Sequence, residues 1–224
     1  MQILPFYLVC DESASMSGEA VDTINKALPE LHQEISENPT VADKTRFALI
    51  GFSDKAAVLQ PLADLSELTS LPSLSAGGMT SFDSAFRVLK DSIEKDVTAL
   101  KAEGHEVYRP VVFFLSDGLP TDSDWESALD TLKDQSKFRY APKIIAFGIS
   151  DADPAIIARV ANFRAFMQNK DSVSPASALR EFAKSLTRSI VTSATSMAAQ
   201  GDSGFDLQVE EKIADFTTLS LDKL

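Results

Sequence analysis

The chain has 224 residues, of which 44% are hydrophobic and 24% are charged, a composition typical of globular domains. Its formal net charge of −12 opposes binding to the phosphates of nucleic acids or to anionic lipids, and favours a cation or a basic partner. One cysteine, Cys10, cannot form an internal disulfide, which fits a reducing compartment. With no basic, apolar leader and no apolar run of about 20 residues, we expect a cytoplasmic protein without membrane insertion.

Short apolar runs alternate with helical stripes along the chain. The apolar runs predict six strands, at residues 3–10, 46–52, 56–62, 110–116, 143–149 and 161–167. Apolar residues spaced by three and four predict helices over 21–35, 85–100, 125–132 and 179–190. We therefore expect an α/β fold, a doubly wound and mainly parallel six-stranded sheet with helices on both faces. The run 56–62 follows a short turn and contains Pro61, which predicts one antiparallel edge strand.

The composition of the sequence changes after about residue 192. We expect one domain over 1–192, then a C-terminal linker and tail over 193–224, beginning with the small, polar, Gly-bearing segment SATSMAAQGDSG. The tail FDLQVE…KIADFTTLSL leaves two interpretations open. It is either disordered or loosely docked, or it adds a strand to a sheet edge of this chain or of a partner.

Oxygen-bearing side chains gather in three segments. Each segment lies directly after a predicted strand or at the start of the helix that follows one. Asp11, Ser13 and Ser15 come directly after the first strand, Thr80 lies in GGMTSFDS, and Asp117 follows the run ending in FFL. Alternate residues of an extended segment point the same way, so we expect the first three to face one point at the ligand-binding edge of the sheet. Two carboxylates and three hydroxyls suit Mg²⁺, with Mn²⁺ or Ca²⁺ also possible, and the lack of His or Cys disfavours zinc. Turn formation and helix capping alone would also explain each segment separately.

Together, DESASMSG, GGMTS and LSDG resemble the D-x-S-x-S…T…D pattern of the von Willebrand factor A domain and its metal-ion-dependent adhesion site. The resemblance covers roughly residues 3–192. It implies that Ser13, Ser15 and Thr80 contact Mg²⁺, while Asp11 and Asp117 hold the ion largely through bound water. A metal with mostly neutral direct ligands stays electrophilic, so it would accept an Asp or Glu from a partner protein.

More narrowly, LPFYLVCDESASMSGEAVDTINKAL, FSDKAAVLQPLADL and LSDGLPTDSDW are similar to the bacterial cytoplasmic TerY-type proteins of tellurium-resistance and stress operons. Two positions depart from the usual family pattern. Ala14 stands where a Gly is usual, and Met79 replaces the second Gly of the common GGT. The resemblance implies a role in a bacterial stress response.

The expected function is Mg²⁺-dependent protein binding without catalysis. A partner carboxylate would complete the metal site, and the side chains expected to choose that partner are Met16, Ser17, Met79, Leu119 and Thr121. The sequence lacks a second Asp two residues after Asp11, a G-x-S-x-G segment, a P-loop and a G-x-G-x-x-G turn, which disfavours the commoner α/β enzymes. The alternative is a scaffold with a vestigial metal site that binds through its sheet edge or tail. The partner's identity and the oligomeric state stay open.

Overall fold

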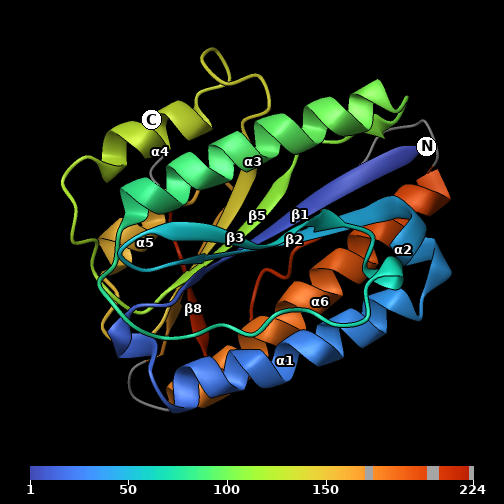
Figure 1. Ribbon diagram of the computed structural model, residues 1–224. Helices are drawn as coiled ribbons and strands as arrows, with labels where there is room; N and C mark the ends of the chain where they lie inside the picture. The colour runs from blue at the N-terminus through green and yellow to red at the C-terminus, as the bar shows by residue number, and fades with distance from the viewer. Residues whose placement is uncertain (170–173, 201–206, 222–224) are drawn as a thin grey trace.

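The computed structural model describes residues 1–169, 174–200 and 207–221, with the side chain of residue 200 left out. Within these residues, one sheet forms the centre of the molecule (Figure 1). Its strands are β1 (Gln2–Asp11), β2 (Thr45–Phe52), β3 (Ala56–Ala63), β4 (Glu106–Val107), β5 (Val111–Ser116), β6 (Lys143–Gly148), β7 (Arg164–Gln168) and β8 (Phe216–Leu219). The α-helices are α1 (Glu19–Ser36), α2 (Pro39–Lys44), α3 (Phe82–Ala102), α4 (Trp125–Lys133), α5 (Pro154–Val160) and α6 (Pro175–Gln200). Two short 3₁₀ turns, η1 (Ala14–Met16) and η2 (Leu65–Glu67), complete the described elements.

The sheet follows the order β3-β2-β1-β5-β6-β7-β8, with β4 paired to β1. β2, β1, β5, β6 and β7 run parallel, and β3 pairs antiparallel with β2 at one edge. The predicted fold class and the antiparallel strand at 56–62 are therefore confirmed. The sheet has eight strands instead of the expected six because β4 was not predicted, and β8 was only one of two interpretations of the tail and was not counted among the six. With two and four residues, these strands are too short to give a clear apolar pattern.

Helices cover both faces of the sheet because its central strands are apolar on both sides (Figure 1). In β1, Leu4, Phe6 and Leu8 pack with α1, α2 and α6, whereas Tyr7 and Val9 pack with α3, α4 and α5 on the other face. The period of two in a strand separates these two sets of side chains. The sequence did not predict α2 and α5, which have six and seven residues and are too short to show an apolar stripe.

An aromatic cluster anchors the beginning of α3. The ring of Phe82, the first residue of the helix, lies 5.0 Å from that of Phe114 and 5.7 Å from that of Phe52, measured between centroids. Trp125 at the start of α4 packs 5.8 Å from the same ring. Because aromatic pairs at such distances add to the energy of burial, this cluster fixes the position of the residues just before α3, including Thr80.

The C-terminal part of the chain differs from the expected linker and tail. Helix α6 continues through residue 192 to Gln200, so the first eight residues of the expected linker are helical. The remainder of the Gly-bearing segment, at 201–206, lies outside the described residues. Strand β8 then pairs antiparallel with β7 and buries Phe216, which is 7% exposed. The interpretation that the tail adds a strand to the chain's own sheet is therefore correct for residues 216–219.

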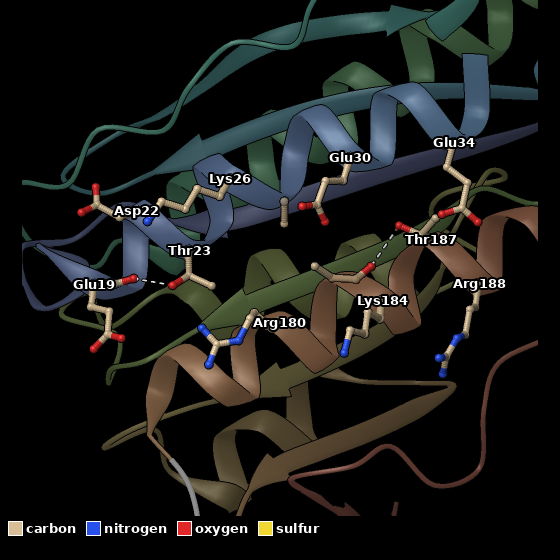
Figure 2. A pocket seen from close by; sticks show the side chains of 12 residues that line it. Glu19, Asp22, Thr23, Lys26, Glu30, Glu34, Arg180, Lys184, Thr187 and Arg188 are labelled. Atoms are coloured by element: carbon tan, nitrogen blue, oxygen red, sulfur yellow. Dashed lines mark hydrogen bonds between the residues drawn. The ribbon is translucent and has the colours of Figure 1, made fainter. Parts of the chain in front are cut away.

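A groove of about 710 Å³ separates α1 from α6 (Figure 2). Four carboxylates and one cation, Lys26, line the α1 side, and three cations line the α6 side, among them Arg180 and Arg188. The groove is lined only by residues of these two helices, so it is separate from the loops at the carboxyl ends of the strands. None of the helices in the described ranges is both long and apolar enough to cross a bilayer.

Candidate metal site

The first part of the site is the turn that follows β1. Asp11 is the last residue of β1, and its Oδ1 accepts a hydrogen bond of 2.8 Å from the backbone N–H of Ser13. The chain then turns through η1, and the hydroxyl oxygens of Ser13 and Ser15 lie 3.0 Å apart. The two hydroxyls converge as expected, but by a different route. They meet because the chain makes a 3₁₀ turn, not because it stays extended.

The second part of the site comes from the end of β5, beside β1 in the sheet. Parallel pairing places Cys10 level with Leu115, so the residues that follow each strand are neighbours. Ser15 donates a hydrogen bond of 2.8 Å to Oδ1 of Asp117. Ser116 donates one of 2.6 Å to Oδ2 of Asp11. The strand order reverses between β1 and β5, so these residues lie at the topological switch point, where open α/β sheets bind ligands.

Thr80 reaches the same place from the loop before α3. A side-chain carbon placed on Gly118 would lie 3.7 Å from Oγ1 of Thr80 and 4.0 Å from Oγ of Ser15, so the two hydroxyls face a common point. The carbonyl of Thr80 accepts hydrogen bonds from the backbone N–H and the hydroxyl of Thr121, at 2.9 and 3.1 Å. The structure thus brings together all five residues that the sequence predicted for the site.

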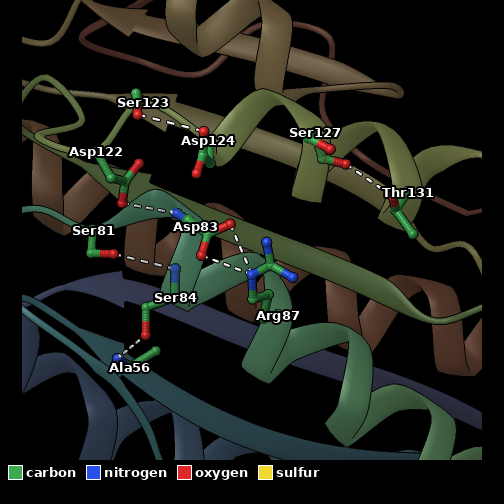
Figure 3. A network of polar contacts seen from close by, with 10 residues as sticks. All are labelled: Ala56, Ser81, Asp83, Ser84, Arg87, Asp122, Ser123, Asp124, Ser127 and Thr131. Carbon is green, nitrogen blue, oxygen red and sulfur yellow. Dashed lines mark hydrogen bonds and ion pairs between the residues drawn. The ribbon is translucent and has the colours of Figure 1, made fainter.

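A polar network holds the loop before α3 in place (Figure 3). Ser81 caps the helix by accepting a hydrogen bond from the N–H of Ser84, whose own hydroxyl accepts one from the N–H of Ala56 in β3. A carboxylate oxygen of Asp122 accepts a hydrogen bond of 3.1 Å from the N–H of Asp83. The start of α3 is therefore tied to β3 and to the loop after β5, which limits the movement of Thr80.

Two carboxylates that the sequence analysis did not single out hold residues 75–79 against the site. Glu12 accepts a hydrogen bond of 2.6 Å from the N–H of Ser75, and Asp54 accepts one of 2.9 Å from the N–H of Met79. The backbone of Glu12 also accepts a hydrogen bond from the N–H of Gly77 at 2.7 Å. Ser116 was missed as well, although its position at the end of a predicted strand next to Asp117 was a usable signal.

Burial dominates the electrostatics of the site. Asp11 is 0% exposed and Asp117 is 4% exposed. Burial, with a smaller contribution from the negative charge of Asp117, raises the pKa of Asp11 to about 6 despite its hydrogen bonds to Ser116 and Ser13. Burial also raises the pKa of Asp117, against the effect of its hydrogen bond from Ser15. No ion pair among the described residues involves either carboxylate, so the pair lacks a counter-charge from the chain.

The donor set fits a hard cation. It consists of oxygen atoms only, and Ser15 is exposed while Ser13 and Thr80 are buried, so the cluster opens to solvent on one side. Nowhere in the described part of the chain do three His, Cys, Asp or Glu side chains form a metal cluster, so a cation here would depend on the hydroxyls. Few carboxylates and several hydroxyls suit Mg²⁺, which keeps several waters, better than Ca²⁺, which takes six to eight oxygen ligands.

Four of the five expected partner-binding residues lie on the surface near this cluster. Met79 and Leu119 are large apolar side chains with exposed fractions of 59% and 54%, and Ser17 and Thr121 are exposed too. Met16 is the exception, since it is 0% exposed and packs in the core beneath η1. The expectation that Met16 contacts a partner is wrong, because the 3₁₀ turn points this side chain inward.

Comparison with known families agrees with the fold. Residues 6–188 match the model of the von Willebrand factor type A domain. The match covers most of the chain, which therefore belongs to this family. No curated protein shows significant sequence similarity to the chain.

Solved structures show the same fold at low sequence identity. One is the ArnB paralogue VWA2 from Sulfolobus acidocaldarius, with a TM-score of 0.56, 19% identity, and coverage of 83% of this chain and 45% of that protein. A von Willebrand factor type A protein from Catenulispora acidiphila has a TM-score of 0.56 and 14% identity, with coverage of 84% and 43%. The pilus adhesin SpaC from Lactobacillus rhamnosus GG, in its open conformation, has a TM-score of 0.60 and 14% identity, with coverage of 85% and 30%. The chain spans less than half the length of each of these proteins.

Proposed function

We propose that this von Willebrand factor type A domain is a Mg²⁺-dependent protein-binding module. The observation that carries the proposal is the meeting of hydroxyl and carboxylate oxygens from three loops at the switch point of the sheet. Ser13 lies 3.0 Å from Ser15 within the loop after β1, and Ser15 donates a hydrogen bond of 2.8 Å to Asp117 in the loop after β5. From the loop before α3, the hydroxyl of Thr80 faces the same point as that of Ser15. The two buried carboxylates have a raised pKa, and a cation beside them would supply the missing counter-charge.

The residues of the cluster would divide the task between them. Ser13, Ser15 and Thr80 would hold Mg²⁺ directly, and Asp11 and Asp117 would orient bound water and neutralise the ion's charge. Asp11 is suited to this role because the hydroxyl of Ser116 and the N–H of Ser13 fix both of its oxygens. When bound, the ion would supply an electrophilic coordination position for an outside oxygen ligand.

The partner would present an Asp or Glu to that position. Met79 and Leu119 are exposed beside the site and would contribute apolar contact around the carboxylate. Ser17 and Thr121 would add polar contacts at the same rim. The comparison with a pilus adhesin supports binding as the role of the fold, although the identity of 14% relates the two proteins by fold alone.

We place the protein, on its resemblance to TerY-type sequences, in a bacterial cytoplasmic stress response linked to tellurium resistance. The segments that carry this resemblance are the strand and turn around Asp11, the β2–β3 edge and the loop after β5. Comparing the survival in tellurite of cells with and without the gene tests this assignment. Equal survival would remove it and leave the metal-binding proposal untouched.

The scaffold alternative is less favoured by the position of the tail. Strand β8 pairs with β7 of the same chain, so it covers the edge of β7, and the backbone groups on that side of β8 cannot pair with a partner's sheet. We also propose that the protein is not an enzyme, which a test with Mg²⁺ and a generic phosphate ester would check. Turnover that depends on Asp11 would contradict this part of the proposal.

Isothermal titration of the full chain with Mg²⁺ tests the metal site. Ser15→Ala removes a hydroxyl of the cluster, and Ser17→Ala removes an exposed hydroxyl two residues away that no described side-chain hydrogen bond uses. We expect binding in the wild type and in Ser17→Ala, and at least tenfold weaker binding in Ser15→Ala. No heat with the wild type, or equal affinity in both variants, would reject the site.

A second measurement tests partner binding. Proteins captured from native lysate with Mg²⁺ should be lost in excess EDTA and with Ser15→Ala, but kept with Asp43→Asn, at an exposed position of α2 outside the site. Capture that persists unchanged in EDTA would favour the scaffold alternative instead.

A further inference from the structure

A small pocket at the opposite end of the sheet is lined by three cations. Lys101 from the last turn of α3, Arg109 just before β5 and Arg139 from the loop after α4 surround a cavity of about 180 Å³, with Tyr108 and Tyr140 between them. We name this cavity the Tyr140 pocket. β5 begins beside it at Val111 and ends at Ser116 in the metal site. At 3.2–3.4 Å per strand residue, the two sites are separated by roughly 20 Å.

The three cations are held in place. The ring of Tyr140 packs against Phe138 with centroids 6.1 Å apart, which fixes its orientation. Lys101 Nζ lies 5.0 Å from the centroid of the Tyr140 ring, and the guanidinium carbon of Arg139 lies 5.7 Å from it. Arg109 donates a hydrogen bond through Nη1 to the carbonyl of Ala141. Cations that are already ordered lose less conformational entropy when they bind a ligand.

The charge of the pocket contrasts with that of the molecule. The net charge of the chain is −12, yet no carboxylate lines the Tyr140 pocket. The groove between α1 and α6, the pocket between α3 and α4 and the pocket beside Glu210 each contain both cations and carboxylates. Throughout the described ranges, no ion pair within 4.0 Å involves Lys101, Arg109 or Arg139. Their charges are therefore available to an anion from outside.

We propose that the Tyr140 pocket binds a single dianionic phosphate group. Its volume is below the roughly 300 Å³ at which pockets for drug-sized ligands begin, so it would take one group and not a whole nucleotide. Two guanidinium groups offer forked donors that match the oxygens of a phosphate. A phosphate charge of about −2 also interacts more strongly with three positive side chains than the single charge of a carboxylate does. Free phosphate and a phosphorylated side chain of another protein present the same chemistry to this pocket.

The test is a titration of the full chain followed by nuclear magnetic resonance of its backbone amides, in EDTA and at constant ionic strength. EDTA keeps phosphate from binding through a metal ion at the other end of the sheet. The probes are inorganic phosphate, a short phosphoserine peptide, the same peptide without phosphate, and acetate. The variants are Arg139→Gln alone, Arg109→Gln with Arg139→Gln, and Lys95→Gln, which removes an exposed cation of α3 outside the pocket.

We expect inorganic phosphate to shift amides around residues 101, 109 and 139–141, and to bind at least tenfold more tightly than acetate. The double variant should weaken phosphate binding at least tenfold, Arg139→Gln alone at least threefold, and Lys95→Gln less than twofold. Tighter binding of the phosphopeptide than of inorganic phosphate would identify a phosphorylated protein as the source, and the reverse would identify a small molecule. The proposal is overturned if acetate binds as tightly as phosphate, or if Arg139→Gln and Lys95→Gln have equal effects.

Discussion

Replacing Asp11 with Asn should stabilise the metal-free protein at neutral pH. Asp11 is fully buried, and its burial raises the pKa from the ordinary 3.8 to about 6. At 1.36 kcal/mol per pKa unit, keeping this carboxylate ionised at pH 7.5 costs about 3 kcal/mol. In the variant, the amide oxygen can still accept the hydrogen bond from the N–H of Ser13. The amide nitrogen cannot accept one from Ser116, so that hydroxyl has to turn and become the acceptor. We therefore expect a net gain in the free energy of unfolding of about 1–2 kcal/mol.

The sign of the pH dependence follows from the direction of the pKa shift. The folded state binds the Asp11 proton more tightly than the unfolded state does, so the wild type loses stability as pH rises from about 4 to 6. The advantage of Asp11→Asn should therefore be present at pH 7.5 and absent below pH 4. With Mg²⁺ bound, the wild type should instead be more stable than Asp11→Asn. A ligand at 100 times its Kd adds about 2.7 kcal/mol to the free energy of unfolding of the protein that binds it.

Urea unfolding in EDTA at pH 4 and pH 7.5, followed by the fluorescence of Trp125, measures these differences. Asp43→Asn, at an exposed position of α2, is the control and should change the free energy of unfolding by less than about 0.5 kcal/mol. A variant that is less stable than the wild type at pH 7.5 in EDTA would refute the reasoning. So would an advantage of equal size at both pH values.

Three further predictions concern other parts of the fold. Gly51→Ala should cost about 1–2 kcal/mol, since its side-chain carbon would lie 1.8 Å from a carboxylate oxygen of Glu12 and 2.9 Å from Cδ1 of Leu59, the end of a flexible side chain that can move away. The carboxylate of Glu12 would have to shift and lose its hydrogen bond from the N–H of Ser75. Urea unfolding should show a smaller cost in a Glu12→Ala background, and an equal cost there would contradict the mechanism. Tyr7→Phe should cost about 1–2 kcal/mol because the buried phenol donates to Asp96 at 3.0 Å, and a loss under 0.5 kcal/mol would show that water replaces the phenol. Burial lowers the pKa of Lys133 to about 8, so the charged side chain destabilises the folded state and this cost falls as the pH rises above 8. Raising the pH from 7 to 10 should therefore increase the stability of the wild type relative to Lys133→Met by about 1–2 kcal/mol, after allowing for partial exposure. A stability difference that urea unfolding finds unchanged between these pH values would refute this.

The candidate site was predictable as a set of residues but not as a geometry. Asp11, Ser13, Ser15, Thr80 and Asp117 could be chosen because oxygen-bearing side chains that follow parallel strands, or that stand at the start of a helix packed on them, meet at one edge of a sheet. The extended arrangement expected for Ser13 and Ser15 was wrong, since local turn geometry depends on hydrogen bonds that the sequence does not display. That geometry also decides that Met16 points into the core and not towards a partner.

The sequence by itself determined the elements whose pattern is strong and long. Strands such as 110–116 are continuous in apolar residues because both of their faces are buried. Helices α1 and α3 carry clear apolar stripes because only one face of each is buried. Tertiary structure alone decided that Phe216–Leu219 would pair with β7, that α6 would continue to Gln200, and that Glu12 and Asp54 would hold the loop before Thr80. Each of these outcomes depends on a contact between residues far apart in the chain, and a short or polar segment gains its structure from such a contact and not from its own pattern.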